Sequence, residues 1–398
     1  MELYLQMGHG MQNISLDLFN QWGGGTIILS PMNISSTRIT AFSTKVNKLG
    51  GNILFDPQLY FPRKYQKSLS KYTYWPHENI TLLESGSFDS VIDQLIQLNQ
   101  SVGSTTFILP SLTTDRIDSR WNELQKAIIT SAKKIDHSFT VYHTVALSSK
   151  VMMNEEQIEK VVNYVEEWDV GGIYIVCEHS SGKYLVDDTL WVSNQLSLVA
   201  GIKRAGKKVI VGYSNHQQLC LATAKCDAIA SGNFRNVRWF QPEHFETIES
   251  DEQSRRAKWY YCPQALTEFK VTFLDIAQRM ALLHVLKADG QMGNLYSDML
   301  FGGAIPSSTG YSESDSFKHY LWCLNEQCKT AVRSTYKETY DAQMAMLDTA
   351  EQILTALHDK RIRGQDRDFM DIISINEAAL AAHDMAYQFS LSQEWDNL

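Results

Sequence analysis

The sequence has no paired cysteines, no long apolar run and no excess of positive charge. Its six cysteines are scattered without a CxxC pair, which argues against a disulfide framework and against a zinc ribbon. No apolar run approaches the roughly 20 residues of a membrane-spanning helix, and the opening residues MELYLQMGHG lack the basic and apolar regions of a signal peptide. We therefore expect a cytoplasmic protein with no membrane partner, whose cysteines are reduced and mostly buried.

The charge balance limits the class of binding partner. A formal net charge of -9 disfavours a surface that is basic throughout. A local basic groove for nucleic acid is still compatible with this total, because binding follows the distribution of charge more than its sum. With 398 residues, of which 44% are hydrophobic and 20% charged, the chain is long enough for one large globular domain with an appendage.

Short apolar runs alternate with longer amphipathic segments over residues 1–240, a pattern typical of βα units that build a parallel sheet. The predicted strands are 3–7, 26–29, 52–55, 105–109, 139–147, 172–177, 208–212 and 228–230, and the predicted helices are 12–22, 37–49, 88–100, 118–134, 154–168 and 188–205. The clearest helix, 154–168, begins at Asn154, a good N-cap residue. Eight such units have the size and rhythm of an α/β fold of the closed (β/α)8 type, a TIM-type barrel. An open doubly wound sheet is the alternative, although the first two strands carry no G-x-G-x-x-G turn of the dinucleotide type.

The pattern changes after residue 240. We expect 1–240 to form the barrel, 241–265 to connect, and 266–398 to form a helical C-terminal region packed on the barrel. Within the connection, 258–262 is predicted to be a short aromatic strand or loop. Helical spacing recurs in 266–287, 314–332, 335–360 and 372–390. This helical region is also the expected contact for a protein partner.

Polar residues end each predicted strand, and in a barrel these ends meet at one mouth where the active site lies. The residues are His9, Asn33, Asp56, Gln58, Ser111, His143, Glu178, His179, Asn215, His216, Ser231 and Arg235. Carboxyl and imidazole groups in one cleft can supply acid–base catalysis, because burial and mutual repulsion move their pKa values apart. The alternative is that many of these side chains only cap helices or bind loop amides.

Asp56 is the strongest catalytic candidate, since it ends an apolar strand and Pro57 fixes the chain immediately after it. A helix or turn cap is the alternative role. Glu178 and His179 are adjacent on a strand, so only one of them can face the mouth, and we favour Glu178. Each candidate histidine stands alone on its strand, without the His-x-His pair of many metal-dependent barrel hydrolases. We therefore predict neither a metal ion nor a cofactor.

The last two predicted strands favour phosphate binding. In many barrels the loops after strands seven and eight hold phosphate through backbone amides at a helix N-terminus. Asn215 and the pair Ser231-Gly232 occupy these positions, and Arg235 and Arg238 would add positive charge. The alternative is that the arginines and the aromatic residues beside them clamp a neighbouring helix.

Two segments carry a resemblance to a known family, ILFDPQLY at 53–60 and VGYSNHQQLCLATAKCDAIASGNFRN at 211–236. They resemble the tRNA-guanine transglycosylase superfamily, barrel enzymes that exchange a base in nucleic acid for a deazaguanine, including the branch that modifies DNA. In that family a strand ends in an aspartate that recognises the base, which Asp56 matches. The later strand, the acidic strand and the arginine-asparagine segment are matched in order by Val211, Gly212, Asp227, Arg235 and Asn236.

The chain departs from this family at three points. The glycine turn after the first aspartate is replaced by Pro57-Gln58-Leu59, and the family's nucleophilic aspartate falls near Ala230 or Ser231. The cysteine-rich zinc motif near the C-terminus is absent from the sequence.

The resemblance implies a transglycosylase-like enzyme, a glycosyltransferase acting on a base in a nucleoside or in nucleic acid. Asp56 would bind the base, and Glu178 or Asp227 would serve as nucleophile or acid. The binding site would be completed by His9, Asn33, Gln58, His143, Asn215, Ser231 and Gly232. Phosphates would be held by Arg235, Arg238, Lys64, Lys67 and Lys71. The tyrosines of the 60–74 loop would stack on an exposed base. Two alternatives remain, an enzyme acting on a small phosphorylated metabolite and an inactive barrel that serves as a subunit of a complex.

Overall fold

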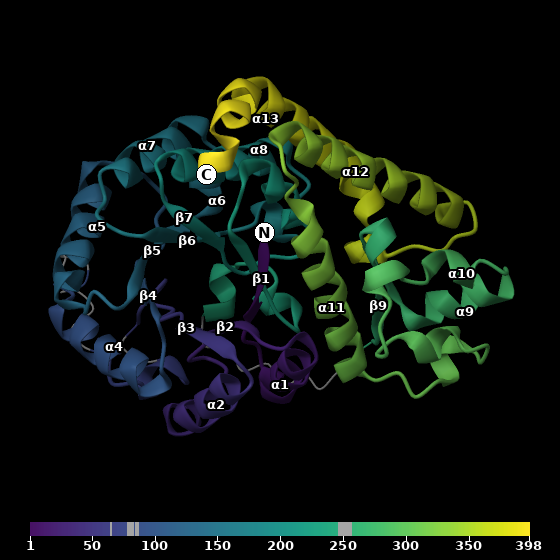
Figure 1. Ribbon diagram of the computed structural model, residues 1–398, viewed down its shortest axis with the longest axis horizontal. Coiled ribbons are helices and arrows are strands. Elements are labelled where there is room, and N and C mark those ends of the chain that lie inside the picture. Colours follow the sequence, from purple (N-terminus) through teal and green to yellow (C-terminus); the bar gives the residue numbers. More distant parts are fainter. Residues whose placement is uncertain (64–65, 78–82, 84–86, 246–256) are drawn as a thin grey trace.

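The computed structural model describes residues 1–398 except 64–65, 78–82, 84–86 and 246–256, and it contains an eight-stranded parallel barrel with helices around it (Figure 1). The strands are β1 Glu2–Gln6, β2 Gly25–Leu29, β3 Gly51–Phe55, β4 Thr106–Leu109, β5 Thr140–Leu147, β6 Gly172–Cys177, β7 Lys208–Val211 and β8 Ala228–Ser231. They are hydrogen-bonded in the order β3-β2-β1-β8-β7-β6-β5-β4, so the first strand lies beside the eighth. The predicted (β/α)8 barrel is confirmed.

The barrel has one seam, between β3 and β4, where the described strands form no backbone ladder. At this seam the hydroxyl group of Ser104 lies 2.8 Å from the carbonyl oxygen of Ile53 in β3 and 2.6 Å from that of Thr106 in β4. A side chain therefore links the two strands where the ladder is interrupted, and the barrel is nearly closed.

Helices alternate with these strands as predicted. They are α1 Met11–Trp22, α2 Ser36–Lys48, α4 Asp89–Val102, α5 Ser119–Ser131, α6 Ser149–Met152, α7 Glu155–Glu166 and α8 Thr189–Arg204, and the 3-10 helix η5 His216–Ala224 follows β7. The predicted cap of α7 is present, since the side chain of Asn154 accepts a hydrogen bond from the amide of Gln157.

The C-terminal region begins with a hairpin that the helical spacing did not predict. Strands β9 Trp259–Cys262 and β10 Thr267–Lys270 are antiparallel, and Tyr260 lies opposite Phe269 with both rings buried. The predicted helix from residue 266 is therefore wrong over its first turn, because cross-strand packing of buried aromatic rings outweighs helical periodicity there. The elements that follow are α9 Val271–Arg279, α10 Leu283–Leu286, α11 Glu313–Ala331, α12 Tyr336–His358 and α13 Ile373–Glu394, with the short turns η8 Pro263–Ala265 and η9 Gly290–Met292 between them.

Helix α11 takes the place of the eighth barrel helix, since it packs against β1 and α1 (Figure 1). Its Phe317 contacts Phe234 after β8, with ring centroids 4.7 Å apart, and its Lys318 pairs with Asp17 of α1 at 2.5 Å. Helix α13 packs on α8, and α12 packs on η5 and α13. The C-terminal region thus continues the helical layer around the barrel.

Inside the barrel, glycines on or directly after one strand lie against tyrosine side chains from a neighbouring strand. A methyl group at Gly172 would lie 2.4 Å from the ring of Tyr142, and one at Gly212 would lie 2.3 Å from the hydroxyl oxygen of Tyr174. The two glycines therefore make room for tyrosine side chains that cross the barrel.

All six cysteines are buried and unpaired, as predicted. Among the described helices, none has both the length and the apolar composition needed to cross a lipid bilayer.

Candidate functional site

The carboxyl group of Asp56 is the centre of the polar cluster at the carboxyl end of the barrel. Its Oδ2 atom accepts hydrogen bonds from the hydroxyls of Tyr60 at 2.8 Å and Tyr213 at 3.0 Å, and the hydroxyl of Tyr174 lies 3.4 Å away. Its Oδ1 atom accepts the amide of Gln58 at 2.9 Å. We call Tyr60, Tyr174 and Tyr213 the tyrosine cage; they come from the loop after β3, from β6 and from the loop after β7.

Burial controls the protonation of this carboxyl group. It raises the pKa of Asp56 to about 6, and the hydrogen bonds from the Gln58 amide and the tyrosine cage offset only part of that effect. Burial and the nearby carboxyl group raise the pKa of each cage tyrosine well above its usual value. Near neutral pH, Asp56 is therefore the member of the cluster that can gain or lose a proton.

Two strained residues meet beside Asp56. Gln58 and Tyr213 are not glycines, yet their φ angles are 53° and 52°, in the left-handed region. The side-chain amide of Gln58 donates to the Tyr213 hydroxyl at 2.7 Å, and its carbonyl oxygen accepts the hydroxyl of Ser30 at 3.1 Å. Such conformations cost on the order of 1–3 kcal/mol each and cluster at functional sites. The strain thus marks the same place as the buried carboxyl group.

Gln6 on β1 adds an unused hydrogen-bond donor. Its side chain is fully buried, and its Oε1 atom lies 3.2 Å from the hydroxyl of Tyr174. Its Nε2 atom has no hydrogen-bond partner among the described residues. Because an unpaired buried donor costs about 1–3 kcal/mol, this amide is a candidate ligand contact.

Aromatic rings cover the cluster. Tyr60 lies 5.0 Å from both Phe240 and Phe245, centroid to centroid, and these two phenylalanines are 5.4 Å apart. Asp56 is only 1% exposed as a result. This covering excludes water from the carboxyl group and strengthens the electrostatic interactions around it.

Glu178 also lies at the carboxyl end of the barrel, where it follows β6. Its Oε2 atom accepts a hydrogen bond from the backbone amide of Ser149, at the start of α6, at 2.8 Å. Glu178 therefore caps a helix, which is the alternative to a catalytic role given above for the residues at the strand ends. The adjacent His179 is buried between the rings of Trp191 and Trp239, at 5.2 and 5.8 Å. Burial lowers the pKa of His179 to about 4.

Asp227 lies at the opposite end of the barrel from Asp56. It precedes β8, and its Oδ2 atom accepts hydrogen bonds from the ammonium group of Lys203 at 2.9 Å and from the backbone amide of Val209 at 2.7 Å. The structure therefore does not bring Asp227 into the cluster, because the amino ends and carboxyl ends of parallel strands lie on opposite faces of a barrel.

His143, Ser111 and Ser231 point outward from the strands toward the helices. His143 Nε2 and the Ser111 hydroxyl lie 2.8 and 2.9 Å from Oε1 of Gln125 in α5, and burial lowers the pKa of His143 to about 3. Ser231 is a neighbour of the inward Ala230 and therefore faces the other side. Strand alternation keeps His143 and Ser231 out of the barrel mouth, and the hydrogen bond to Gln125 holds Ser111, in the loop after β4, on the same outer side.

His9 and Asn33 lie on the rim. His9 is exposed, and Asn33 donates to the carbonyl oxygen of Met7 at 3.1 Å. Lys67 and Lys71 are exposed, whereas the predicted Lys64 lies outside the described residues.

Three of the tyrosines predicted to stack on an exposed base are buried, and the fourth, Tyr65, lies outside the described residues. Tyr60, Tyr72 and Tyr74 are only 2–3% exposed, and the Tyr74 hydroxyl donates to the carbonyl oxygen of Pro57 at 2.8 Å. The loop therefore packs these three rings into the core instead of presenting them to solvent.

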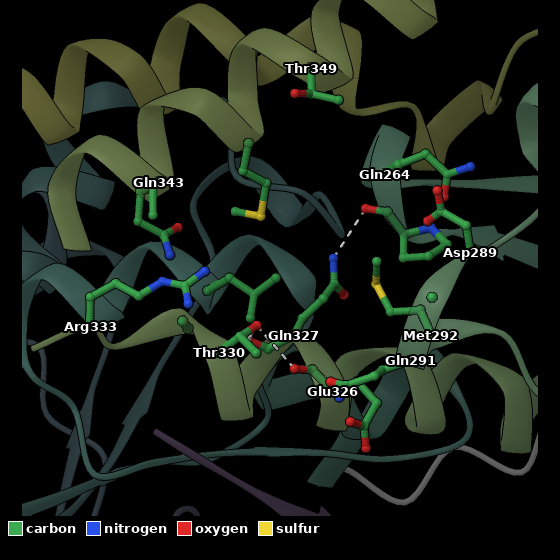
Figure 2. A pocket seen from close by; sticks show the side chains of 16 residues that line it. Gln264, Asp289, Gln291, Met292, Glu326, Gln327, Thr330, Arg333, Gln343 and Thr349 are labelled. Carbon is green, nitrogen blue, oxygen red and sulfur yellow. Dashed lines mark hydrogen bonds between the residues drawn. The ribbon is translucent and has the colours of Figure 1, made fainter. Parts of the chain in front are cut away.

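A cavity of about 520 Å³ lies in the C-terminal region, between α11, α12, η8 and η9 (Figure 2). None of the predicted site residues lines it. Among the described residues there is also no group of three or more histidine, cysteine, aspartate or glutamate side chains that could hold a metal ion.

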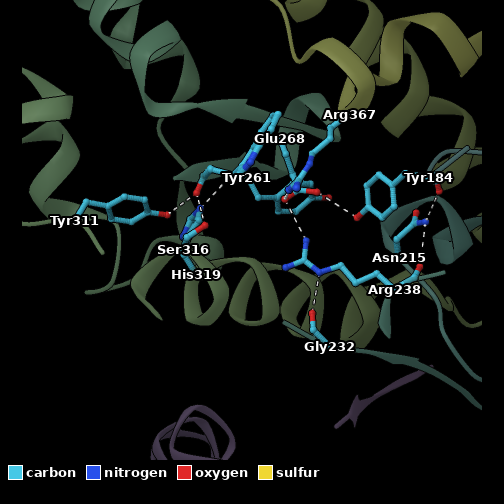
Figure 3. Close-up of polar contacts among 11 residues, drawn as sticks. Tyr184, Asn215, Gly232, Arg238, Tyr261, Glu268, Tyr311, Ser316, His319 and Arg367 are labelled. Atoms are coloured by element: carbon cyan, nitrogen blue, oxygen red, sulfur yellow. Dashed lines mark hydrogen bonds and ion pairs between the residues drawn. The ribbon is translucent and has the colours of Figure 1, made fainter. Parts of the chain in front are cut away.

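The predicted phosphate-binding arginines, Arg235 and Arg238, are engaged with carboxylates of the C-terminal region; Figure 3 shows the contacts of Arg238. Arg238 is 2% exposed, and it donates to the carbonyl oxygen of Gly232 at 2.8 Å and to Glu268 at 3.1 Å. Arg367 donates to the same carboxylate oxygen at 2.7 Å. Arg235 pairs with Asp366. We call Arg238, Glu268 and Arg367 the buried ion triad; it joins the loop after β8 to β10 and the C-terminal region.

Asn215, predicted to bind phosphate at the start of the helix after β7, also bonds to the chain itself. Asn215 caps η5, where its Oδ1 atom accepts the amide of Gln217 at 2.8 Å, and its amide donates to the carbonyl oxygen of Tyr184 at 3.1 Å. His216 is buried beside Tyr261, with ring centroids 5.0 Å apart, and burial lowers its pKa to about 4. These groups hold the barrel and the C-terminal region together.

Three members of the cluster were not predicted: Gln6, Tyr174 and Tyr213. Gln6 and Tyr174 lie within strands, where the alternation of side chains could have assigned them to the barrel interior. Tyr213 has no such signal, because its inward direction depends on a left-handed backbone.

Comparisons with known proteins gave only distant fold similarity. No family model matches the chain, and no curated protein matches it. Solved structures with some similarity include a thermostable mutant xylanase from Cellvibrio japonicus, with a TM-score of 0.34 and 11% identity over 57% of this chain and 84% of that one. A xylose isomerase domain protein from Planctomyces limnophilus has a TM-score of 0.31 and 10% identity, over 53% of this chain and 72% of that one. The Xyl-CE4 domain of a multidomain xylanase from the hindgut metagenome of Trinervitermes trinervoides has a TM-score of 0.19 and 11% identity, over 53% and 87%.

These findings correct the family assignment made from the sequence. The structures just named are not tRNA-guanine transglycosylases, and no model of that or any other family matches the chain. The two segments that resembled the family are a barrel strand with its loop and a further pair of barrel strands. The structure supports the barrel architecture for this chain, and the comparisons assign it to no family.

Proposed function

We propose that the chain is an enzyme that uses Asp56 as a general acid–base group on a small, uncharged polar molecule. The observation that carries the proposal is the buried carboxyl group of Asp56, whose pKa is raised to about 6 inside the tyrosine cage. Groups with a pKa close to the working pH are the most effective proton-transfer catalysts. The strain at Gln58 and Tyr213 supports the same location.

In this proposal Asp56 transfers the proton and Gln6 binds the substrate. A hydroxyl or amide of the substrate would replace a tyrosine hydroxyl on Oδ2 of Asp56, and Asp56 would then take up or give a proton at that atom. The unpaired Nε2 of Gln6 would donate a hydrogen bond to a substrate oxygen. Entry of the substrate requires the rings of Phe240 and Phe245 to move aside, since they cover the cage.

The charges around the site favour an uncharged substrate over a phosphorylated one. The interactions that act on Asp56 are hydrogen bonds and burial, with no cation among the described residues. Arg235 and Arg238, which would otherwise meet a phosphate, are paired with Asp366 and Glu268. A phosphate near Asp56 would therefore bring a second negative charge without a counter-charge.

The experiment is a thermal-shift screen on the whole chain with D-glucose, D-xylose, adenosine and uridine, each beside its phosphorylated form where one exists. An uncharged ligand is expected to raise the unfolding midpoint by about 2 °C or more when it is well above its Kd. Asp56→Asn and Gln6→Leu should each abolish the shift. The control Asp341→Asn, at an exposed residue of α12 paired with Lys337, should keep it.

A hit would then be incubated with the protein and its products followed by mass spectrometry across pH 5 to 8. A rate that rises through pH 6 identifies Asp56 as the base, and a rate that falls identifies it as the acid. A shift produced only by the phosphorylated compounds, or one that survives Asp56→Asn, would contradict the proposal.

A second candidate function is an inactive barrel that serves as a structural subunit. The observation that favours it is the complete satisfaction of Asp56, which is 1% exposed and hydrogen-bonded through both oxygens by the protein itself. If the barrel is inactive, no compound in the thermal-shift screen should raise the unfolding midpoint, and Asp56→Asn should change stability without changing any activity.

A further inference from the structure

The cavity of the C-terminal region carries a feature that the proposed function does not use. It has a volume of about 520 Å³, within the range of small-molecule sites, and it shares no residue with the tyrosine cage (Figure 2). Helices α11 and α12 form its two long walls.

Opposite charges lie at the two ends of this cavity. Figure 2 shows Arg333 at one end and Asp289 at the other, with Gln327 and Thr330 between them. Only the backbone of Arg333 and of Asp289 forms hydrogen bonds, and neither charged group has an ion-pair partner among the described residues. Each charge is therefore available to a ligand.

Unpaired amides lie between the two charges. Gln343 is only 3% exposed, its amide points into the cavity in Figure 2, and it has no hydrogen-bond partner among the described residues. The Oε1 atom of Gln264 is buried without a partner, although its Nε2 atom donates to the carbonyl oxygens of Val285 and Lys287 at 2.9 Å. The amide of Gln343 is therefore open to a ligand with amides of its own, and the unpaired Oε1 of Gln264 costs about 1–3 kcal/mol that a new hydrogen bond would recover.

The remaining lining is mixed: Gln291, Thr349 and Glu326, which pairs with Lys329, are polar, and the other part is apolar and adaptable. Met292, Met346 and Leu219 border the same space. Methionine side chains adjust to ligands of different shape, so this surface suits an aliphatic side chain without demanding a particular one.

We propose that this cavity binds a short peptide with free ends. The carboxylate of the peptide pairs with Arg333, its ammonium pairs with Asp289, and its backbone amides bond to Gln343 and Gln264. A free amino acid does not satisfy this arrangement, because it carries both charges on one carbon while the cavity separates them to opposite ends. A peptide separates its two charges by about 3.3–3.6 Å for each residue, so its ends can lie apart as Arg333 and Asp289 do.

The test is isothermal titration calorimetry of the whole chain with Ala-Leu-Ala. The free tripeptide is expected to bind, whereas the N-acetylated and the C-amidated forms should bind at least about tenfold more weakly, because each loses one charge-assisted contact. Arg333→Met, Asp289→Asn and Gln343→Leu are each expected to weaken binding of the free tripeptide by about tenfold or more.

Matched controls are Arg279→Met and Asp359→Asn, which remove exposed charges that do not line the cavity. Both should bind as the unaltered chain does, and melting curves of all variants check that they fold. The proposal is overturned if Ala-Leu-Ala does not bind at 10 mM, a concentration about tenfold above a Kd of 1 mM, if the blocked forms bind equally well, or if Arg333→Met and Asp289→Asn have no effect. Because the cavity and the tyrosine cage share no residue, such a failure leaves the role of Asp56 untouched.

Discussion

At the scale of single residues, Asp56 and Glu268 are two buried carboxyl groups whose surroundings act in opposite directions. Burial raises the pKa of Asp56 to about 6, since only neutral donors face it. Burial would raise the pKa of Glu268 as well, but the guanidinium groups of Arg367 and Arg238 outweigh it and hold that pKa at about 2. One group is therefore prepared for proton transfer and the other for a permanent ion pair.

The raised pKa of Asp56 predicts how its substitution changes stability with pH. Between about pH 4 and 6 the unfolded chain has lost this proton while the folded chain keeps it, so the contribution of Asp56 to folding falls as pH rises and is constant above 6. A shift of about two pKa units corresponds to about 3 kcal/mol. Part of this change has already occurred at pH 4.5, which lies above the usual pKa of an aspartate, so urea unfolding at pH 4.5 and 7.5 should show that Asp56→Asn gains about 2 kcal/mol relative to the unaltered chain on going to the higher pH. Equal differences at both pH values would mean that the pKa of Asp56 is ordinary.

The buried ion triad predicts a large effect from a small change. Glu268→Gln removes the negative charge but leaves the buried guanidinium of Arg238 and the largely buried one of Arg367, and we expect it to lower the free energy of unfolding by about 3–5 kcal/mol at pH 7. The control is Glu394→Gln, which breaks the pair with Arg204 where both side chains are 40% exposed, and it should cost less than about 1 kcal/mol. Similar losses in urea unfolding for both variants would contradict this account.

At the scale of elements, the barrel strands are fitted to one another by glycines that face tyrosines. Gly212, directly after β7, leaves room for the Tyr174 side chain of β6, whose hydroxyl reaches Asp56 and Gln6. The position of the tyrosine cage thus depends on a residue with no side chain, on a neighbouring strand.

Gly212→Ala is expected to destabilise the chain by about 1–3 kcal/mol, because its methyl group would lie 2.3 Å from the hydroxyl oxygen of Tyr174. The same variant should displace that hydroxyl from Asp56, and any ligand found for the cage should bind more weakly. Gly310→Ala is a suitable control, since no atom lies within 4 Å of the point that its methyl group would occupy. Thermal unfolding and ligand titration of the two variants check this, and equal behaviour would rule out the fit between Gly212 and Tyr174.

At the scale of the whole molecule, the helical layer of the barrel is completed by residues from the end of the chain. We propose that 1–240 form the barrel, 241–265 connect, and 266–398 form the helical region, and that the two larger parts fold as one cooperative unit. Helix α11 covers β1, α13 covers α8, and the buried ion triad ties the loop after β8 to β10 (Figures 1 and 3).

A chain truncated after residue 240 should therefore fail to fold cooperatively, because the side of the barrel covered by α11 would be exposed and Arg238 would lose Glu268. Co-expression with residues 257–398 as a separate chain should restore soluble protein. Sedimentation of the lysate and thermal unfolding of the soluble fraction measure both outcomes. A truncated chain that unfolds in one sharp transition would mean that the barrel is independent of the helical region.

The sequence by itself determined the repeating βα units, the eight barrel strands to within a residue or two, and the inward position of Asp56. These follow from local periodicity, since strands with two buried faces and amphipathic helices are recognisable from neighbouring residues alone. The same periodicity was misleading at Thr267–Lys270, where a buried hairpin replaced a predicted helical turn.

Only the tertiary structure decided which distant residues meet. Barrel closure brought Gln6, Tyr174 and Tyr213 to Asp56, placed Asp227 at the opposite end, and turned Arg238 toward Glu268. It also gave α11 the role of the eighth barrel helix. The physical reason is that contacts between residues far apart in sequence depend on how strands close and how helices pack over them, which no local pattern specifies.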